Sequence, residues 1–585
     1  MRATGKRLGS ILLALAMLLS LLPVTALAVP EGRVVLPEGV TEESFTGSAV
    51  IYYNGSYYDS FDAALAMANA DQSEGPAVFY CKPGADMGEQ THMHVKRSLT
   101  VYGNGAYISG GEHDFELDTY RDNGEEGSCL TGDVTLTLYS LDGAAVWSQR
   151  NSTYTLNLYL KDCRYMNRVY LSGTSGANNI TLKDCTFDSE KWVSSCTIYS
   201  NAPGEILVEG CTFTGVQEPI NLNNKAAPGT TQTITVKDCT FTNCSTTDIC
   251  IKDVTWAAPI RVVSSAGAAS NLTVEECTFT AEGGKEYCNG HILLGDGRVN
   301  ENSYPVSASI VNTDALVQIQ NPGDRTADRN SARELQVTAD QGAQVTNATV
   351  KNETTGAAYL SLESAWDDVQ TGEVLTLLAD ADDVSDLYTT GKAVSVNLDG
   401  HDVTFGETCG FVVNGGGLNL TGAGKVIASN PNSGYSTIQV NGSSSDIAGY
   451  STLTVGEQVT LVNTAGKFAV GVLPASGASA ANGVVVDFAG RIETAAGITI
   501  NGTVTDNGPN MPQIILRGTA VINSDGTALY AAGCGRWIIQ GGSITSTTTA
   551  METRAGQAEI QAGTLKSTAA QFQCDPNGNG TTTIG

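Results

Sequence analysis

Charged residues are scarce in this sequence, and basic residues are the scarcest of them. They make up 16 % of 585 residues, with 32 Lys and Arg against 61 Asp and Glu, for a formal net charge of −29. Proteins that bind nucleic acid neutralise phosphates with Lys and Arg, so this balance argues against nucleic acid as a partner. It also weighs against acidic polysaccharides unless the fold conceals a basic groove.

Residues that commonly bind metals are also few. The chain has only 5 histidines, and its 14 cysteines include no Cys-x-x-Cys pair, which leaves little basis for a zinc site. His92 and His94 stand two residues apart, with Glu112, His113 and Asp114 further along the chain. Two histidines at that spacing are weak evidence for a metal, and we expect polar residues on a rim instead. The sequence therefore predicts no metal and no cofactor.

Long hydrophobic runs are absent after the N-terminus. Three basic residues precede the apolar run at 11–22, and a small-x-small pattern of the kind that signal peptidase cleaves ends at Ala28. The run is shorter than the roughly 20 residues that a membrane-spanning helix needs. We therefore expect residues 1–28 to be a cleaved secretory signal peptide, with an uncleaved anchor as the alternative, and no membrane span in the mature chain.

A short motif recurs in the first half of the sequence. It reads ITLKDCTF at 180–187 and returns at 206–213, 234–241 and 272–279, with a looser copy at 158–165. Its cysteines, Cys163, Cys185, Cys211, Cys239 and Cys277, follow one another at intervals of 22, 26, 28 and 38 residues. A fixed motif at variable spacing predicts a coil whose strands stack in register while loops of different length leave between them.

The order of apolar residues inside the motif predicts where the coil turns. Ile180 and Leu182 alternate as in a strand, and so do Cys185 and Phe187, but the step between the pairs is three residues. A corner is therefore expected at Lys183-Asp184. Stacked coils would then form interior ladders of Cys and Phe and an exterior ladder of Thr. We expect the cysteines to pack as small hydrophobic residues, with disulfides as the alternative.

A second repeat block follows, and both blocks begin alike. The second block has glycines before apolar residues at its predicted corners: Gly424, Gly456, Gly490, Gly518, Gly542 and Gly563. Each block opens with an amphipathic stretch, near 59–70 and near 361–369, with Asp59 and Ser361 as the expected N-caps. We interpret each as a helix that covers the open end of a solenoid.

These patterns predict an all-β chain of two consecutive solenoids. The expected order is a first solenoid over 29–320, a linker over 321–345 and a second solenoid over 346–585. The motif [IL]-x-[LV]-[KE]-x-C-T-F resembles that of the right-handed parallel β-helix family, which includes pectate lyases, polygalacturonases and many surface adhesins. The leader resembles those of secreted and surface proteins of Gram-positive bacteria. The resemblance implies a right-handed helix and a protein secreted from, or displayed on, a bacterial cell.

Candidate site residues are few. Trp147, Trp192 and Trp256 stand in contexts that read as loops of the first solenoid, where they could contact sugars. His291, Asp296 and Arg298 form a second candidate ligand-binding group. Polygalacturonase-like motifs occur in the wrong order, with Asn312-Thr313-Asp314 after His291, so no catalytic residue is assigned. The sequence favours a non-catalytic adhesin or glycan-contacting module, with a polysaccharide lyase or glycoside hydrolase acting in a groove of the first solenoid as the alternative.

Overall fold

The chain is all-β and forms parallel β-helix solenoids, as predicted. We describe a computed structural model, which contains two α-helices within its described part. The described residues are 34–90, 92–109, 114–117, 130–149, 153–173, 175–188, 196–250, 257–264, 268–295, 306–319, 335–339, 342–406, 410–428, 436–442, 450–474, 483–501, 511–554, 556–574 and 581–584. The predicted signal peptide lies outside these residues.

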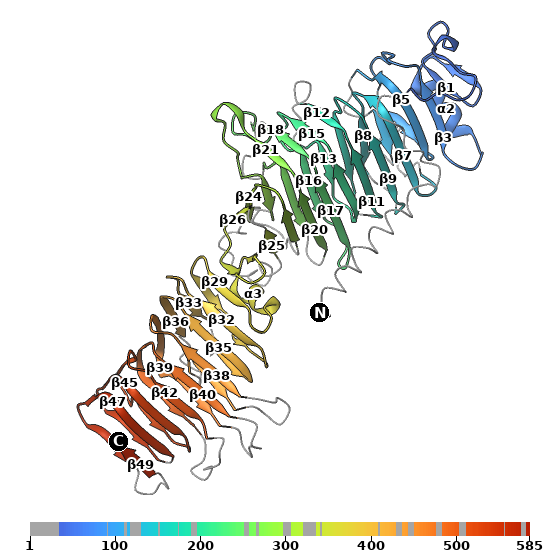
Figure 1. Cartoon of the computed structure of the whole chain (residues 1–585). Helices are drawn as coiled ribbons and strands as arrows, with labels where there is room; N and C mark the ends of the chain where they lie inside the picture. The colour runs from blue at the N-terminus through green and yellow to red at the C-terminus, as the bar shows by residue number, and fades with distance from the viewer. Residues whose placement is uncertain are drawn as a thin grey trace. The chain divides into compact units, whose positions relative to one another are not determined.

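The chain divides into two compact units. One comprises residues 1–192 with 209–212, and the other comprises 193–208 with 213–585. Figure 1 shows strands stacked side by side within each unit.

Two parallel stacks form the first unit. Sheet A contains β1 (Ile51–Tyr53), β2 (Ser56–Tyr58), β3 (Ala77–Cys81), β5 (Leu99–Tyr107), β7 (Val134–Asp142), β9 (Leu156–Lys161) and β11 (Asn178–Lys183), and sheet B contains β4 (Met93–Val95), β6 (Phe115–Leu117), β8 (Ala145–Gln149) and β10 (Arg168–Ser172). A 3-10 turn at Glu42–Ser44 precedes them, and β12 (Thr186–Asp188) follows. From β3 to β11 and from β4 to β10 each strand pairs in parallel with the next coil.

The helix α2 (Phe61–Ala70) covers the apolar start of the first unit. Its side chains Phe61, Ala64, Leu65 and Ala68 are buried, as the amphipathic pattern predicted. The ring of Phe61 packs edge-on against Phe115, with centroids 5.4 Å apart. The expected N-cap was wrong by one residue: Ser60, not Asp59, accepts the helix N–H of Ala63, because its hydroxyl directly precedes the first helical turn.

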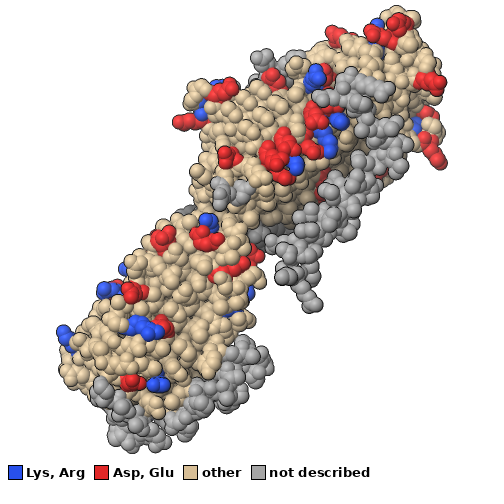
Figure 2. All heavy atoms as spheres, in the orientation of Figure 1, with Lys and Arg blue, Asp and Glu red and all other residues tan. Residues whose placement is uncertain are grey.

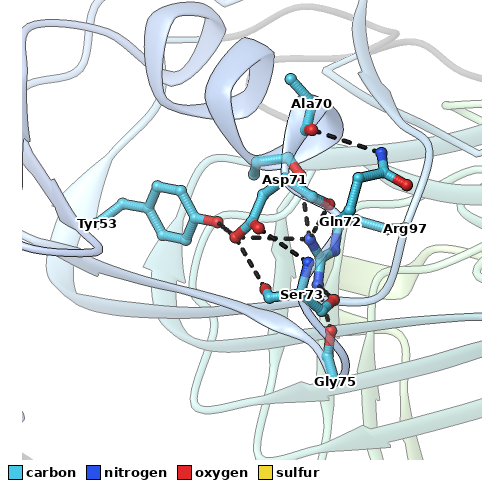
Figure 3. A network of polar contacts seen from close by, with 8 residues as sticks. Tyr53, Ala70, Asp71, Gln72, Ser73, Gly75 and Arg97 are labelled. Atoms are coloured by element: carbon cyan, nitrogen blue, oxygen red, sulfur yellow. Dashed lines mark hydrogen bonds and ion pairs between the residues drawn. The ribbon is translucent and has the colours of Figure 1, made fainter.

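Arg97 holds the far end of this helix (Figure 3). Its guanidinium donates to the carbonyl oxygens of Asp71 at 2.6 Å, Ser73 at 2.8 Å and Gly75 at 2.5 Å. The carboxylate of Asp71 accepts the hydroxyl of Tyr53 at 2.8 Å. One side chain therefore satisfies carbonyl groups that the helix end and the following turn leave unpaired.

The second unit begins with the same kind of coil. Its strands up to residue 346 are β13 (Ile198–Ser200), β16 (Ile220–Asn224), β17 (Thr231–Lys237), β18 (Thr240–Thr242), β19 (Ile260–Ser264), β20 (Ala269–Glu275), β21 (Thr278–Thr280), β22 (Ile292–Leu294), β23 (Val306–Val311), β24 (Leu316–Ile319), β25 (Leu335–Ala339) and β26 (Gln344–Thr346), with a 3-10 turn at Glu282–Gly284. The strands β14 (Gly204–Glu209) and β15 (Thr212–Thr214) span the division between the units in sequence.

The interior ladders are confirmed. All five motif cysteines are buried and free. Phe241 lies between Phe213 and Phe279, with centroids 4.9 Å from each and planes within 10° of parallel. The threonines between the Cys and Phe positions are partly or fully exposed, so they point outward as expected.

The predicted corner is also confirmed. Asp184 and Asp238 both adopt left-handed backbone conformations, with φ of 54° and 52°. Asp tolerates this region better than most residues, which explains its place at the corner. The left-handed residue turns the chain between the apolar pair and the Cys-x-Phe pair, so both face the interior.

The predicted linker at 321–345 is described only in part. Its residues 335–339 form β25, which pairs in parallel with β23 and antiparallel with β28 (Ala357–Tyr359). The sheet thus continues through the described end of this segment. The domain boundary itself stays a prediction.

The second solenoid lies within the second unit and stacks in three parallel rows. Its remaining elements are β27 (Val350–Asn352), α3 (Leu362–Asp368), β29 (Val374–Leu377), β30 (Ala381–Val384), β31 (Leu387–Tyr388), β32 (Ala393–Asn397), β33 (Val403–Phe405), β34 (Phe411–Asn414), β35 (Gly416–Thr421), β36 (Gly424–Ala428), β37 (Ile438–Asn441), β38 (Ser451–Val455), β39 (Val459–Leu473), β40 (Val484–Phe488), β41 (Arg491–Ile500), β42 (Gln513–Leu516), β43 (Val521–Ser524), β44 (Leu529–Ala531), β45 (Arg536–Ser546), β46 (Thr549–Thr553), β47 (Gln557–Ser567), β48 (Ala570–Cys574) and β49 (Thr581–Ile584). Its core is one continuous apolar cluster.

A capping helix and close-packed glycines complete this solenoid. In α3, Leu362, Ala365 and Trp366 are buried against the core, and Ser361 is the N-cap, as predicted. At the corner residue Gly490, an added Cβ would lie 2.6 Å from the Val459 carbonyl oxygen, which leaves no room for a side chain. The glycine there permits close contact between successive coils.

Candidate functional site

Trp147 lies in a strand rather than in a loop. It is the central residue of β8, with Val146 and Ser148 buried on the interior side, so strand alternation points Trp147 outward. The loop expectation was wrong because the flanking small residues belong to the strand. Its ring stacks on Tyr170 with centroids 4.5 Å apart, and the guanidinium carbon of Arg168 lies 4.4 Å from the centroid. These neighbours occupy ring surface that a sugar would otherwise contact.

Next to Trp147 on sheet B lies a buried carboxylate. Glu116 pairs in register with Trp147 on one side and His94 on the other, and its side chain is 1 % exposed. His92 Nδ1 lies 2.7 Å from one carboxylate oxygen and His94 Nδ1 lies 3.2 Å from the other. Within the described residues, no group of three or more His, Cys, Asp or Glu side chains is arranged to hold a metal ion.

His291 belongs to an aromatic stack. Its ring lies 4.7 Å from Phe279 with planes 6° apart, and Tyr287 packs edge-on at 4.4 Å. Its Nδ1 accepts the backbone N–H of Leu316 at 3.0 Å. Burial lowers the pKa of His291 to about 4, so the ring is neutral near pH 7. These contacts give the residue a packing role, which sequence reasoning did not anticipate.

The other candidate residues, Trp192, Trp256, Asp296 and Arg298, lie outside the described residues. Their assignment as ligand-binding residues stays a prediction, and the structure does not test the grouping of Asp296 and Arg298 with His291.

A second polar cluster lies on sheet B of the second unit. Glu218 accepts a hydrogen bond from the Asn221 amide at 2.7 Å and one from the Cys196 thiol at 3.0 Å, and Arg261 donates to Asn221 at 3.3 Å. Glu218 and Arg261 are 2 % and 4 % exposed. Groups this deeply buried suit a structural network better than general acid–base catalysis in an open groove.

A tyrosine strip on sheet A of the first unit was missed by sequence reasoning. Its members are Tyr57, Tyr52, Tyr80, Tyr102, Tyr139 and Tyr159, each within 6.4 Å of the next between ring centroids. Tyr80, Tyr102 and Tyr139 occupy the same register position on β3, β5 and β7. Their rings are stacked at 5.2 Å, with planes 12° and 10° apart. All six point outward, away from the solenoid interior.

The surface around the tyrosine strip is uncharged over β3, β5 and β7, and Lys161 at the end of β9 lies in register with Tyr139. The other outward residues of β3, β5, β7 and β9 before Lys161 are Val78, Thr100, Thr135, Thr137 and Asn157. This face is therefore uncharged up to Lys161, in a chain whose formal charge is −29, and within it Tyr139 and Thr137 are only 7 % and 8 % exposed. Figure 2 shows the same contrast across the visible surface, where clusters of acidic and basic side chains alternate with broad uncharged areas.

A signal for the strip was present in the sequence. Tyr102 and Tyr139 each follow a threonine by two residues, at Thr100 and Thr137, on strands whose alternate residues are apolar. The period-2 pattern places these residues outward. Only the register between coils, which depends on loop length, shows that the rings stack.

Next to this surface, Lys and acidic residues on successive coils form ion pairs. Lys161 and Lys183 continue the register of Tyr139 along sheet A, and Lys183 Nζ lies 2.6 Å from Glu209 Oε2. The alternation of Lys and acidic residues at successive coils thus forms a solvated edge with paired charges.

Within the described part of the chain, no helix is long and apolar enough to cross a membrane. Comparisons of the chain with protein-family models, with curated proteins and with solved structures found no match in any of the three.

Proposed function

We propose that this chain is a secreted or cell-surface β-helix protein that binds extracellular glycans without chemical turnover. We also propose that the chain is related to pectin-lyase-like proteins of Gram-positive bacteria, which its motif and leader resemble. The observation that carries it is the tyrosine strip on sheet A, whose members other than the buried Tyr139 are partly or fully exposed. Tyrosine offers a flat apolar body and a hydroxyl, a combination suited to sugars, which carry both C–H faces and hydroxyl groups.

The rigidity of the scaffold supports the same function. Side chains on a continuous parallel sheet are held in place by the strands on either side, so little conformational freedom is lost on binding. Threonine and asparagine beside the tyrosines supply further donors and acceptors. Glu218 and Arg261 are buried, which favours binding over catalysis. The ring of Trp147 is already in contact with Tyr170 and Arg168, which favours the same conclusion.

A glycan panel tests the proposal. The purified mature chain is incubated with immobilised plant and host glycans, and binding is measured together with the release of reducing ends and unsaturated sugars. We expect retention of at least one neutral glycan without product formation. Tyr102→Ala should weaken that binding about tenfold or more, while Tyr450→Ala, at an exposed tyrosine of the second solenoid, should leave it unchanged.

Two results contradict the proposal. Release of new reducing ends or unsaturated products would show a hydrolase or a lyase. Absence of binding to every glycan on the panel, with a folded protein, would remove the glycan-binding role.

A further inference from the structure

Two cysteines outside the buried ladder face each other across a pair of loops. Cys250 directly follows the turn at 247–249, after β18, and Cys288 lies in the loop between β21 and β22. Both thiols are free, and Cys250 is buried while Cys288 is partly exposed. Their side chains are in hydrogen-bond contact although they lie far apart in the sequence. An ion pair between Lys285 Nζ and Asp248 Oδ2, 2.9 Å apart, joins the same two loops.

Backbone hydrogen bonds hold the two loops together. Thr246 and Tyr287 form an antiparallel bridge, and the N–H of Cys288 donates to the Ser245 carbonyl at 3.0 Å. The N–H of Cys250 donates to the Thr246 carbonyl at 3.1 Å, so the chain makes one turn and returns toward the bridge. The contact between the two thiols is therefore set by the backbone, not by two long side chains that happen to meet.

This arrangement differs from that of the ladder cysteines. Cys239 and Cys277 directly precede β18 and β21, which pair in parallel register, so their side chains point in the same direction. Parallel side chains are poorly aimed for the torsion of a disulfide, and each of these thiols donates to a backbone carbonyl. Cys250 and Cys288 lie on antiparallel segments, so their side chains approach each other from opposite sides.

The two thiols have different chemical roles. Burial raises the pKa of the Cys250 thiol, and the contact with Cys288 raises it further. Burial also raises the pKa of Cys288, but there the contact with Cys250 acts in the opposite direction and lowers it. The Cys250 thiol is therefore the hydrogen-bond donor, and it stabilises the thiolate of Cys288. Cys288 is also the more exposed of the two, so an oxidant in solution meets it first.

We propose that Cys250 and Cys288 form a reversible disulfide bond in exchange with small-molecule disulfides. The Cys288 thiolate attacks one sulfur of such a disulfide, which forms a mixed disulfide and releases one small thiol. Cys250 gives its proton to solvent and attacks the sulfur of Cys288, which releases the second small thiol. The protein loses two electrons and two protons, and the small disulfide is reduced to two thiols. This modification site is independent of the proposed glycan binding.

A disulfide here would fix the loop beside the end of the phenylalanine ladder. Tyr287 precedes Cys288 and packs edge-on against His291, with centroids 4.4 Å apart. The bond would restrict the chain between the two cysteines, so the loop pair should open less often in the oxidised protein. The Cys288 amide donates across the loop pair, and its hydrogen exchange therefore reports the opening. The proposed secretion of the chain is compatible with this, because disulfides persist outside the cytosol.

Oxidation of the full mature chain tests the proposal. Reduced protein is incubated with oxidised glutathione, remaining thiols are blocked with iodoacetamide, and peptides are analysed without reduction, with fragmentation to assign the linked residues. We expect a crosslink between Cys250 and Cys288 that disappears with dithiothreitol. Hydrogen exchange of the Cys288 amide should be about tenfold or more slower in the oxidised protein.

Serine variants separate the two roles. Cys250→Ser should stop at the mixed disulfide, so that a glutathione adduct accumulates on Cys288. Cys288→Ser should form no crosslink and leave the buried Cys250 without an adduct. Cys196→Ser, at another partly exposed cysteine, is the matched control and should form the crosslink as the wild type does. Thermal unfolding of each variant verifies that the fold is retained.

Several results would overturn the proposal. One is a folded wild-type protein in which Cys288 never pairs with Cys250. Another is pairing of Cys288 with Cys196, and a third is an equal glutathione adduct on Cys288 in the wild type and in the Cys250→Ser variant, which would show that Cys250 does not resolve it. A crosslink that leaves the exchange of the Cys288 amide unchanged would contradict the predicted effect on the loop pair.

Discussion

The imidazole of His291 continues the phenylalanine ladder, with its centroid 4.7 Å from that of Phe279 and the two planes 6° apart. The ladder thus ends on a titratable ring. Because the backbone N–H of Leu316 donates to its Nδ1, the contact requires a nitrogen without a proton at that position. Protonation of the ring would convert this acceptor into a donor facing another donor.

The first prediction follows from this neutral histidine. Its folded-state pKa of about 4 lies below the ordinary value of 6.5, so the unfolded chain binds the proton first as the pH falls. The full stability is present above pH 6.5 and decreases between pH 6.5 and pH 4, by about 2–3 kcal/mol from this residue. His291→Phe should flatten this part of a plot of unfolding free energy against pH. An unchanged pH dependence in the His291 variant would refute the assignment.

The second prediction concerns the interior of the ladder. Phe241 is fully buried between two parallel rings, and neighbouring coils are held by backbone pairing, so they cannot collapse into a cavity. Phe241→Ala should lower the free energy of unfolding by about 3–5 kcal/mol, measured by denaturant titration. Thr240→Ala, one residue away and pointing outward, should change it by less than about 1 kcal/mol. Similar losses in both variants would contradict the inward and outward assignment.

The third prediction addresses the thiols. Burial raises the pKa of Cys81, and a contact with Cys239, followed by burial, raises that of Cys277; the thiolate is the reactive form. Iodoacetamide at pH 8, followed by peptide mass spectrometry, should therefore label the partly exposed Cys196 and Cys288 first among the cysteines whose side chains the structure describes. The ladder cysteines should be labelled only after unfolding because all five are buried, including Cys185, whose pKa is lowered by its contacts with Cys163 and Cys211. Rapid labelling of Cys239 in the folded protein would show that the ladder is accessible.

Much of this fold could be predicted because the same strand motif recurs several times in the sequence. The alternation within ITLKDCTF, with its one step of three residues, correctly placed Cys185 and Phe187 inside and the corner at Asp184. The amphipathic patterns correctly placed both helices. Local patterns decide these features, so a single sequence is sufficient for them.

The side-chain stacks between coils could not be predicted in the same way. Whether Tyr102 meets Tyr139, or Phe279 meets His291, depends on how many residues each loop absorbs before the next strand begins. Trp147 was misplaced for a related reason, since small residues around it resemble a loop until the pairing of β8 with β10 is known. Register is a tertiary property, and it determines the candidate site.

The fourth prediction concerns Arg97, whose guanidinium contacts the carbonyl oxygens at and beyond the end of α2. Lysine keeps the charge but cannot reach several carbonyls with one planar group. Arg97→Lys should destabilise the first unit by about 2–3 kcal/mol, with faster hydrogen exchange of the last α2 amides. Arg491→Lys, at an exposed arginine that pairs only loosely with Glu493 at 3.8 Å, is the control and should have little effect. Unchanged exchange in α2 would rule out this role.

The last prediction concerns the helix that opens the second solenoid. Trp366 is 4 % exposed, its indole N–H donates to the Tyr388 carbonyl at 2.9 Å, and its ring lies 5.4 Å from Phe411. If α3 protects the apolar end of the stack, Trp366→Ala should cost about 3–5 kcal/mol and increase the binding of a hydrophobic dye. Trp366→Phe should cost less, about 1–2 kcal/mol, because it mainly leaves the Tyr388 carbonyl without its donor.

Asp367→Ala, on the exposed side of the same helix, separates a loss of packing from a loss of helix propensity. Equal stability of the Trp366→Ala and Asp367→Ala proteins would mean that the helix does not cap the solenoid, since only the buried side of a cap contributes to covering the core.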